Sequence, residues 1–202
     1  KFIFTGIMKR LSKIERKTKE TQIIVSLCLD GKGDGKIDSG IPFLNHMLEL
    51  FSKHGLFDLE VKAKGDIEVD YHHTMEDLGI VLGTALKEAI GDKKGIRRYG
   101  FCILPMDEAL ALVSLDISGR PALSYELNQP VDNVSGIDVR LFREFFYAIA
   151  VNAGITLHIK LLAGQEIHHI LESVFKAFAK ALSQAVEIDP RVKGVPSTKG
   201  IL

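Results

Sequence analysis

The chain lacks tryptophan altogether, and its 202 residues include only two cysteines, Cys28 and Cys102. Both lie in apolar, strand-like stretches, so we interpret them as reduced thiols of the core, and nothing in the sequence requires a disulfide between them. No apolar run approaches the roughly 18 residues of a membrane span, and the first residues have no signal-peptide layout. We therefore expect a cytoplasmic protein with no membrane partner, in which Met8 is the native start and residues 1–8 hold a leader or tag remnant.

Net charge is also missing. The 26 Lys and Arg residues are balanced by 26 Asp and Glu residues, and no basic run occurs. Affinity for nucleic acid depends on neutralising phosphates, so the composition argues against a nucleic-acid partner. A hydrophobic content of 46% predicts a packed globule.

The most informative pattern is a His-His-x-x-Glu unit that occurs twice and uses four of the seven histidines. Both units open stretches with helical spacing. Helix positions four apart share a face, whereas adjacent positions point roughly 100° apart. Each unit therefore presents one histidine beside its glutamate and turns the other histidine elsewhere. The residues are His72, His73 and Glu76 in the first unit and His168, His169 and Glu172 in the second.

Neutral imidazole together with carboxylate suits Zn, Mn, Fe, Co or Ni. Two diverging histidines in each of two units suggest two metals that share ligands between the units. The preceding helix adds His46, whose duplicate position 98 residues on is Glu144. A symmetric centre would bind one metal through His46, His73, His168 and Glu172, and the other through His72, Glu76, His169 and Glu144.

The two units belong to an internal duplication, because His72 and His168, like Glu76 and Glu172, are 96 residues apart. Both halves, 9–104 and 105–202, repeat the order strands, helix, strand, His-His helix. Without regular βαβ alternation this order predicts an α+β fold with pseudo-twofold symmetry and helices packed on sheets. We predict helices at 42–53, 72–90, 139–153 and 167–186, and strands at 21–30, 36–38, 57–63, 67–70, 101–104, 108–117, 122–127 and 155–162.

The histidines also have explanations that involve no metal. The second His-His-x-x-Glu unit could repeat the first by chance. His54, at the end of a predicted helix, fits a favourable charge–dipole contact as well as a site role. His158 lies in a predicted strand and its duplicate position is Glu60, so we interpret it as structural.

Eight motifs, in order from about Ile14 to Leu202, resemble the imidazoleglycerol-phosphate dehydratase family of histidine biosynthesis. They are Phe43–Leu48, His54–Asp58, His72–Ile80, Gly95–Gly100, Met106–Ala109, Asp116–Pro121, His168–Ala177 and Pro196–Gly200.

The resemblance implies a duplicated unit like the second domain of a small-subunit ribosomal protein, with helices between sheets. It also implies self-assembly into trimers and a shell of about 24 subunits, with active sites at subunit contacts. Each site would hold two Mn²⁺ ions bound by the histidines and glutamates named above. The chain departs from the family pattern at Asn45 (usually Asp), Glu144 (usually His) and Glu166 (usually Asn). Glu144 matters most, because it replaces an expected metal ligand.

The implied reaction is dehydration of D-erythro-imidazole-glycerol phosphate, a small phosphate substrate, to imidazole-acetol phosphate. An imidazolate form of the ring would expel the side-chain hydroxyl to give a diazafulvene-like intermediate. By resemblance Glu20 is the acid/base, and His54 and Lys199 are further catalytic contacts. The substrate and its phosphate would be bound by Glu20, His46, His54, Arg98, Arg120, Ser197, Thr198, Lys199 and Gly200.

Two rival functions remain open on the sequence. A different dimetal enzyme, such as a hydrolase, could use a metal-bound hydroxide, but the His-Glu-x-x-His signature of zinc proteases is absent. Alternatively, the metals could cement an oligomer without catalysis. A structural site has closed coordination, whereas a catalytic site keeps one position open for substrate.

Overall fold

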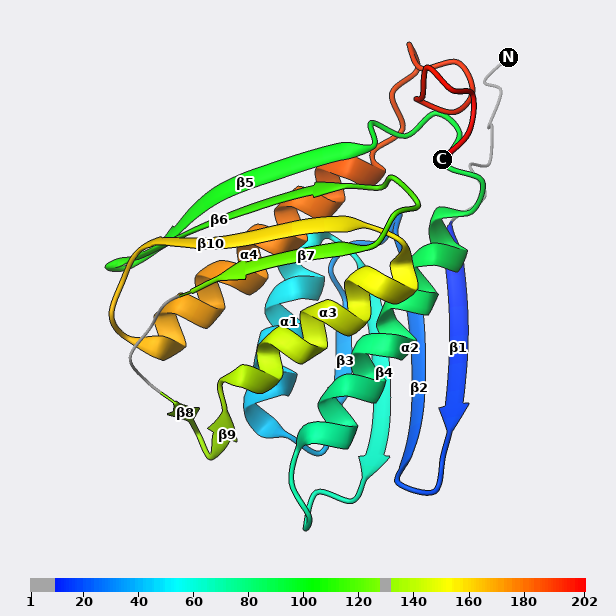
Figure 1. The fold of residues 1–202 in the computed structure, drawn as a ribbon. Coiled ribbons are helices and arrows are strands. Elements are labelled where there is room, and N and C mark those ends of the chain that lie inside the picture. Colours follow the sequence, from blue (N-terminus) through cyan, green and yellow to red (C-terminus); the bar gives the residue numbers. More distant parts are fainter. Residues whose placement is uncertain (1–9, 128–131) are drawn as a thin grey trace.

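The computed structural model describes residues 10–127 and 132–202, so the predicted leader at 1–8 lies outside the described residues. Two four-stranded sheets enclose a layer of four helices (Figure 1). The first sheet has β1 (Leu11–Lys17), β2 (Thr21–Cys28), β3 (Gly35–Asp38) and β4 (Asp58–Gly65). The second has β5 (Tyr99–Met106), β6 (Ala109–Asp116), β7 (Ala122–Glu126) and β10 (Thr156–Ala163). The helices are α1 (Pro42–Gly55), α2 (His72–Ile90), α3 (Arg140–Ala153) and α4 (Ile167–Val186), and β8 (Asn133–Val134) pairs with β9 (Ile137–Asp138).

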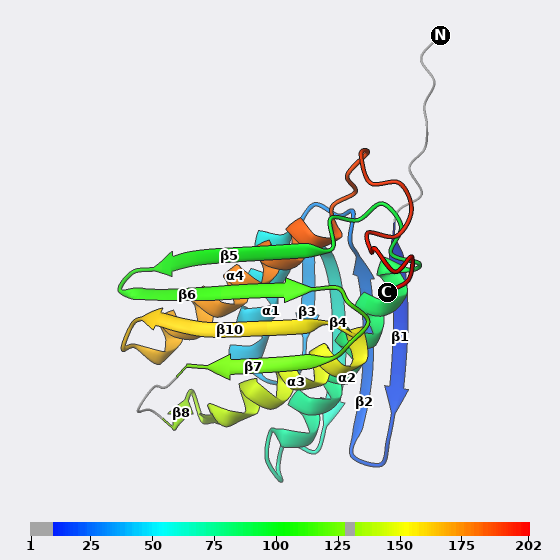
Figure 2. The same cartoon turned by 45° about the horizontal axis from the view of Figure 1, so that its top comes forward.

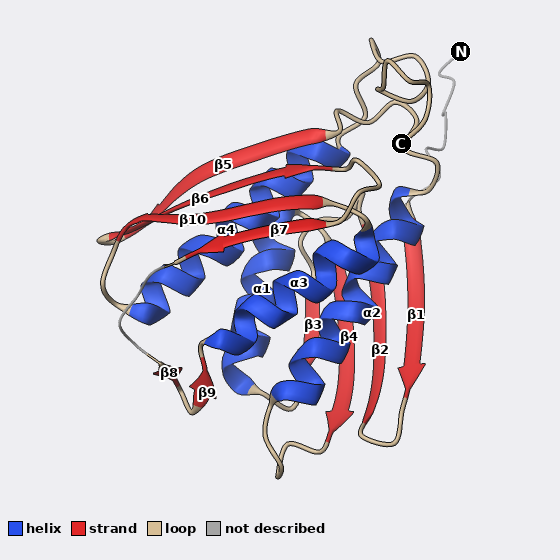
Figure 3. Ribbon diagram, in the orientation of Figure 1, coloured by secondary structure: helices blue, strands red, loops and turns tan. Residues whose placement is uncertain are grey.

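The two sheets have the same topology. Their orders are β1-β2-β4-β3 and β5-β6-β10-β7, and in each the last strand pairs in parallel while the others pair antiparallel. The strands of the two sheets run in crossing directions (Figure 2), and all four long helices lie between them (Figure 3). This arrangement confirms the predicted α+β fold with an internal duplication.

Alternation of side chains makes each sheet one-sided. On β2, Ile23, Val25 and Leu27 are buried, and on β6, Val113 and Leu115 are buried, while the residues between them are more exposed. Because side chains of a strand alternate between faces, this pattern turns one apolar face of each sheet toward the helices. The core is therefore the space between the sheets, filled from both sides.

The helices cross one another in two different ways. On α2, Gly79 and Gly83 lie one turn apart, and a Cβ at these positions would lie 2.6 Å from the carbonyl oxygen of Phe145 and 2.8 Å from that of Ile149, both on α3. The α1–α4 pair instead packs through aromatic rings, with Phe51 and Phe178 stacked at 5.5 Å between centroids. Two glycines thus allow α2 and α3 to approach backbone to backbone.

Several predicted elements need correction. Residues 67–70 form a turn rather than a strand, and β1 was not predicted at all. The strands predicted at 108–117 and 122–127 are consecutive in the chain but not neighbours in the sheet, because β10 lies between β6 and β7. The first helix extends through Gly55, and Leu56, at φ 59°, is its left-handed C-cap. The predicted boundary between the halves, at 104/105, falls inside β5, which pairs with β6 from Tyr99 onward.

Candidate metal centre

Three predicted ligands meet where the first turns of α1 and α4 come together. Nε2 of His46 lies 3.0 Å from Oε1 of Glu172, and Nε2 of His168 lies 3.1 Å from the same oxygen. One ligand atom from each side chain lies within 4.8 Å of the others, the only such group of three or more among residues 10–127 and 132–202. We call His46, His168 and Glu172 the triad.

The carboxylate of Glu172 is oriented by a cation on its far side. Lys176, one turn along α4, donates from Nζ to Oε2 of Glu172, which leaves Oε1 for the two imidazoles. Burial by itself raises the pKa of Glu172, but the bonds from Lys176, His46 and His168 outweigh it and lower the pKa to about 2. The triad is therefore held with an ionised carboxylate, which is the form that binds a metal.

The first His-His-x-x-Glu unit is less complete within one chain. Nε2 of His72 lies 3.4 Å from Oε2 of Glu76, one turn along α2. Glu144, on α3, forms an ion pair at 2.8 Å with its neighbour Arg143. In the part of the chain that the structure describes, these side chains do not gather with a third ligand as the triad does.

The remaining histidine of each pair is held by a carboxylate from a loop. Nδ1 of His73 lies 3.0 Å from Oδ2 of Asp66, and Nδ1 of His169 lies 2.7 Å from Oε2 of Glu108. These bonds raise the pKa of both histidines, and the bond to His169 lowers the pKa of Glu108 to about 2. The predicted acid/base, Glu20, lies at the same corner as His73, with Oε2 3.9 Å from Nδ1.

Within a single chain, His73 and His169 lie apart from the other ligands of the two groups predicted from the sequence. Their ring nitrogens are bonded to Asp66 and Glu108, and whether they bind metal with ligands of another copy stays a prediction. Helical spacing did separate the members of each pair correctly.

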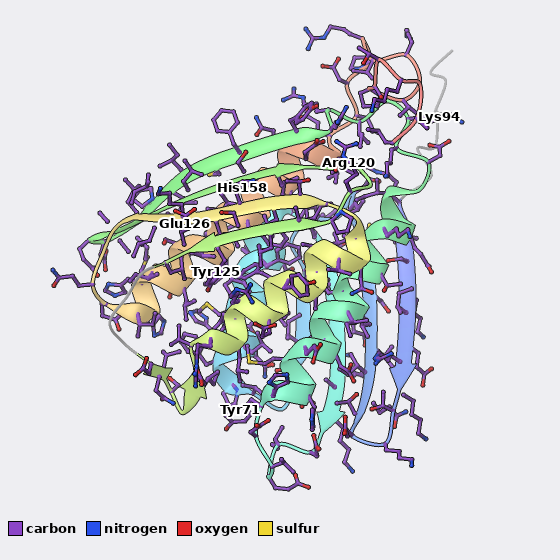
Figure 4. All side chains as sticks on the ribbon, viewed as in Figure 1. Tyr71, Lys94, Arg120, Tyr125, Glu126 and His158 are labelled. Carbon is purple, nitrogen blue, oxygen red and sulfur yellow. The ribbon has the colours of Figure 1, made fainter. Side chains whose placement is uncertain are left out.

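The predicted phosphate residues gather at the other end of the helix layer, where the tail meets the loop before β5 (Figure 1). Arg98 donates from Nη1 to the carbonyl oxygen of Pro196 at 2.9 Å, and backbone bonds join Gly95 to Gly194 at 2.9 Å. Arg120 is exposed and lies in the loop beside this tail (Figure 4). The tail residues, part-buried Ser197 and exposed Thr198, Lys199 and Gly200, form a turn in which the N–H of Gly200 donates to the carbonyl oxygen of Ser197 at 3.1 Å.

Arg98 also has a partner that the sequence did not suggest. Its Nε and Nη2 donate to the two carboxylate oxygens of Asp116 at 2.7 and 3.0 Å. These bonds raise the pKa of Arg98. The forked edge of this guanidinium is therefore bound to a carboxylate, whereas the side chain of Arg120 forms no ion pair with any residue in 10–127 or 132–202.

Two further histidines differ in environment. His54 lies two turns along α1 from His46, half-buried, and burial followed by the nearby Lys176 and Lys180 lowers its pKa. Its position next to α4 keeps a site role open. His158 is exposed on the outer face of β10 (Figure 4).

The positioning residues Asp66, Glu108, Asp116 and Lys176 were not predicted. Three of them do fall in or beside motifs that carry the family resemblance, but a single acid in a loop shows no partner until the fold supplies one. Both cysteines are free thiols. Among the described residues no helix is both long and apolar enough to cross a bilayer.

Comparisons with known proteins agree over almost the whole chain. The family model of imidazoleglycerol-phosphate dehydratase matches residues 39–182. Proteins of that name from Geobacter metallireducens and Alkaliphilus metalliredigens are 57% and 59% identical, each over 96% of this chain and 100% of their own length. The crystal structure of the Staphylococcus aureus protein, 42% identical, superposes with a TM-score of 0.80 over 89% of this chain and 99% of its own. That of the Pyrococcus furiosus protein, 40% identical, gives 0.81 over 94% and 100%. The chain belongs to the imidazoleglycerol-phosphate dehydratase family, the hydro-lyases of histidine biosynthesis.

Proposed function

We propose that this dehydratase acts on D-erythro-imidazole-glycerol phosphate at a centre of two Mn²⁺ ions. The observation that carries the proposal is the triad, in which two imidazole nitrogens and one carboxylate oxygen lie within 4.8 Å of one another. Borderline nitrogen donors together with a hard oxygen donor fit Mn²⁺ and related divalent ions. The second oxygen of Glu172 is held by Lys176, which supports a fixed orientation of the ligand toward a cation.

A metal bound by the triad would act as a Lewis acid toward the imidazole ring of the substrate. Neutral imidazole is the ligating form of histidine, and ionised carboxylate that of glutamate. The low pKa of Glu172, about 2, keeps this carboxylate ionised at every physiological pH. His46, His168 and Glu172 would thus hold the metal without a change in protonation of the carboxylate.

The protein must also move one proton. Dehydration removes the hydroxyl from the carbon next to the ring and a proton from the following carbon, and the resulting enol tautomerises to the ketone. Glu20 is our candidate for the base that takes this proton on its carboxylate. It is half-exposed, and Asp66 rather than Glu20 makes the short bond to His73, so its oxygens remain available for a substrate. His54 and Lys199 are the further candidates for contact with the reacting part.

One chain holds only parts of such a site. The triad lies at the start of α4, and the tail that carries Ser197 and Lys199 follows its end. A helix of 20 residues is about 30 Å long, which is much more than a three-carbon phosphate ester can span. We infer that the site is completed by another copy, in agreement with the proposed trimers and larger shell.

The second metal is expected on the side of His72 and Glu76. At position 144 this chain offers the carboxylate of Glu144, where the family has the imidazole of a histidine. A carboxylate oxygen is a good donor for Mn²⁺, and Glu144 would have to leave Arg143 to ligate. The cytoplasmic location stays a prediction.

The test is a titration of metal-stripped protein. Mn²⁺ is returned in steps while bound metal per chain and turnover of imidazole-glycerol phosphate are both measured. We expect turnover to reach its plateau at about two Mn²⁺ per chain. His46→Gln should lose one metal per chain, whereas the matched variant His158→Gln, an exposed histidine of β10 (Figure 4), should behave as wild type.

The outcomes separate the parts of the proposal. A plateau near one Mn²⁺ per chain would remove the second site, including Glu144, but keep the triad. Unchanged metal content in His46→Gln would show that the triad is not the binding group. Full metal loading without turnover would contradict the dehydratase reaction and favour the rival in which metals only cement an assembly.

A further inference from the structure

Each half of the duplicated chain has a β-hairpin whose tip carries a glutamate. Glu20 stands immediately before β2, and Glu108 immediately before β6. Each glutamate faces the second histidine of the His-His pair in its own half. Oε2 of Glu108 lies 2.7 Å from Nδ1 of His169, but Oε2 of Glu20 lies 3.9 Å from Nδ1 of His73. Equivalent glutamates thus stand in equivalent places, and only one of them makes the bond.

The difference comes from Asp66, the residue that follows β4. Its carboxylate oxygens lie 3.0 and 3.3 Å from Nδ1 of His73, in the place that Glu108 occupies at His169. Its backbone N–H donates to the carbonyl oxygen of Glu20 at 3.1 Å, so the loop that carries Asp66 is tied to the hairpin tip. Asp66 therefore stands between Glu20 and the histidine that Glu20 would otherwise bind.

In the second half, no residue at the position equivalent to Asp66 can take the place of Glu108 as the partner of His169. The residue that follows β10 is Gly164, at φ +129°, and a Cβ there would lie 2.8 Å from Cα of Ala109. With no room for a side chain at this position, Glu108 has to hold His169. Glu108 also accepts the backbone N–H of Glu166 at 3.0 Å, so it is fully engaged.

We propose that Asp66 is a positioning residue that takes over Nδ1 of His73 and so releases Glu20 for proton transfer. A carboxylate that accepts a hydrogen bond from Nδ1–H fixes the tautomer of a neutral imidazole and leaves Nε2 as the nitrogen with a free lone pair. Glu108 likewise accepts from Nδ1 of His169, but we assign it no part in proton transfer. The inference rests on the proposed function insofar as it names Glu20 as the base, but the tautomer of His73 can be measured without metal or substrate.

The experiment uses metal-free protein labelled with ¹⁵N in histidine, at about pH 9, where imidazole is neutral. The ring-nitrogen shifts of His73, assigned by their loss in His73→Asn, report which nitrogen carries the proton. The variants are Asp66→Ala, the isosteric Asp66→Asn, Glu20→Gln, and the double variant Asp66→Ala with Glu20→Gln. Glu68→Ala, an exposed carboxylate two residues along the same loop, is the matched control.

We expect the Nδ1–H tautomer in wild type, in Glu68→Ala and in Glu20→Gln. In Asp66→Ala the carboxylate of Glu20 should turn to His73, so the tautomer persists while kcat falls at least ten-fold. In the double variant the tautomer should be mixed and Mn²⁺ affinity should fall roughly 10- to 100-fold. Asp66→Asn keeps an oxygen acceptor for Nδ1–H and should retain more turnover than Asp66→Ala.

Three results would overturn the proposal. The first is an Nε2–H tautomer in wild type, and the second is an unchanged Nδ1–H tautomer in the double variant. The third is an equal loss of kcat in Asp66→Asn and Asp66→Ala, which would indicate a packing role only. If wild type does not turn over imidazole-glycerol phosphate at all, the proposed function fails, while the tautomer results still decide the role of Asp66 at His73.

Discussion

Arg98 and Asp116 form a two-bond ion pair, Nε to Oδ1 at 2.7 Å and Nη2 to Oδ2 at 3.0 Å. The third guanidinium nitrogen holds the carbonyl oxygen of Pro196. This arginine therefore links the end of β6 to the tail, and its charge is already balanced by a carboxylate. Arg98 holds the tail in place, whereas Arg120 makes no such contact, so we expect their alanine variants to behave differently.

Arg120→Ala should weaken substrate binding alone. If Arg120 binds the substrate phosphate as predicted, the variant loses a charge-assisted bond of about 1.5–3 kcal/mol, which corresponds to a rise in KM of roughly ten-fold or more. Arg98→Ala should raise KM as well, but it should also increase hydrogen exchange in the tail, because Pro196 and Asp116 lose their partner. Steady-state kinetics, metal content and exchange are the measurements. Equal loss of metal in both variants would count against phosphate binding.

The inferred contact between copies predicts complementation. Glu20→Gln removes the proposed base and His168→Gln removes a triad ligand, so each variant alone should be inactive. If the base of one chain serves the triad of another, co-assembly of the two variants should restore a fraction of the activity. The measurement is turnover after joint refolding, with each variant refolded alone as the control. No recovery from verified mixed assemblies would place both residues in the site of one chain.

The close crossing of α2 and α3 predicts an unusual effect of alanine. Gly→Ala inside a helix is normally favourable by about 1 kcal/mol. At Gly79 and Gly83, however, the new Cβ would meet backbone oxygens of α3 at 2.6 and 2.8 Å. We expect each substitution to destabilise by about 1–3 kcal/mol, measured as a lower urea midpoint. Lys87→Ala, on the exposed side of α2, should be close to neutral, and a stabilised Gly79→Ala would contradict the packing described.

The ion pair of Asp189 with Arg191, where the tail begins, should make the stability of the tail depend on pH. Its carboxylate accepts from the backbone N–H and from Nε of Arg191, both at 2.9 Å, and these bonds hold the pKa of Asp189 well below its usual range. Because the folded pKa is depressed, this stabilisation is present above the unfolded value, about 4, and is lost as the pH falls through the folded value.

Exchange protection of the tail amides should therefore stay constant from neutral pH to about 4 and decrease below it. In Asp189→Asn it should be lower at neutral pH and insensitive to acid over the same window. Glu88→Gln, an exposed residue of α2, serves as the control. A wild-type transition near neutral pH would show that another group controls the tail.

The sequence predicted some parts of the molecule with the correct bounds and missed others for identifiable reasons. Both His-His helices begin and end as predicted, at 72–90 and 167–186, because long apolar periodicity and terminal signals agree there. Strand β1 was missed because its only apolar residues, Leu11 and Ile14, lack the period of two expected of a strand, and most of the others are charged. It lies at a sheet edge, where pairing with β2 rather than burial defines the strand. The stretch 67–70 has strand-like residues, but it pairs with no strand among the described residues.

The sequence was enough to name the residues of the site, but not to say which of them contact one another. Helical spacing gave the partners within each motif, such as His168 with Glu172, and the duplication brought His46 into consideration. What the pattern could not supply was which loop carboxylate would face which imidazole. Asp66 and Glu108 occupy unrelated positions in the two halves, and only the packing of hairpin tip against helix start shows that they do the same thing.

The glycine crossing also means that the two halves are no longer interchangeable. The counterpart of Ala148, which faces Gly79, is Leu50 in the first half, and the counterpart of Gly79 is Phe175 in the second. A protein built from two copies of the first half would press leucine into a notch that excludes even a methyl group. One built from two copies of the second half would present a phenylalanine ring where the helices need a bare backbone. The duplicated halves are thus unlike at this crossing, and the present packing of α2 against α3 requires one of each.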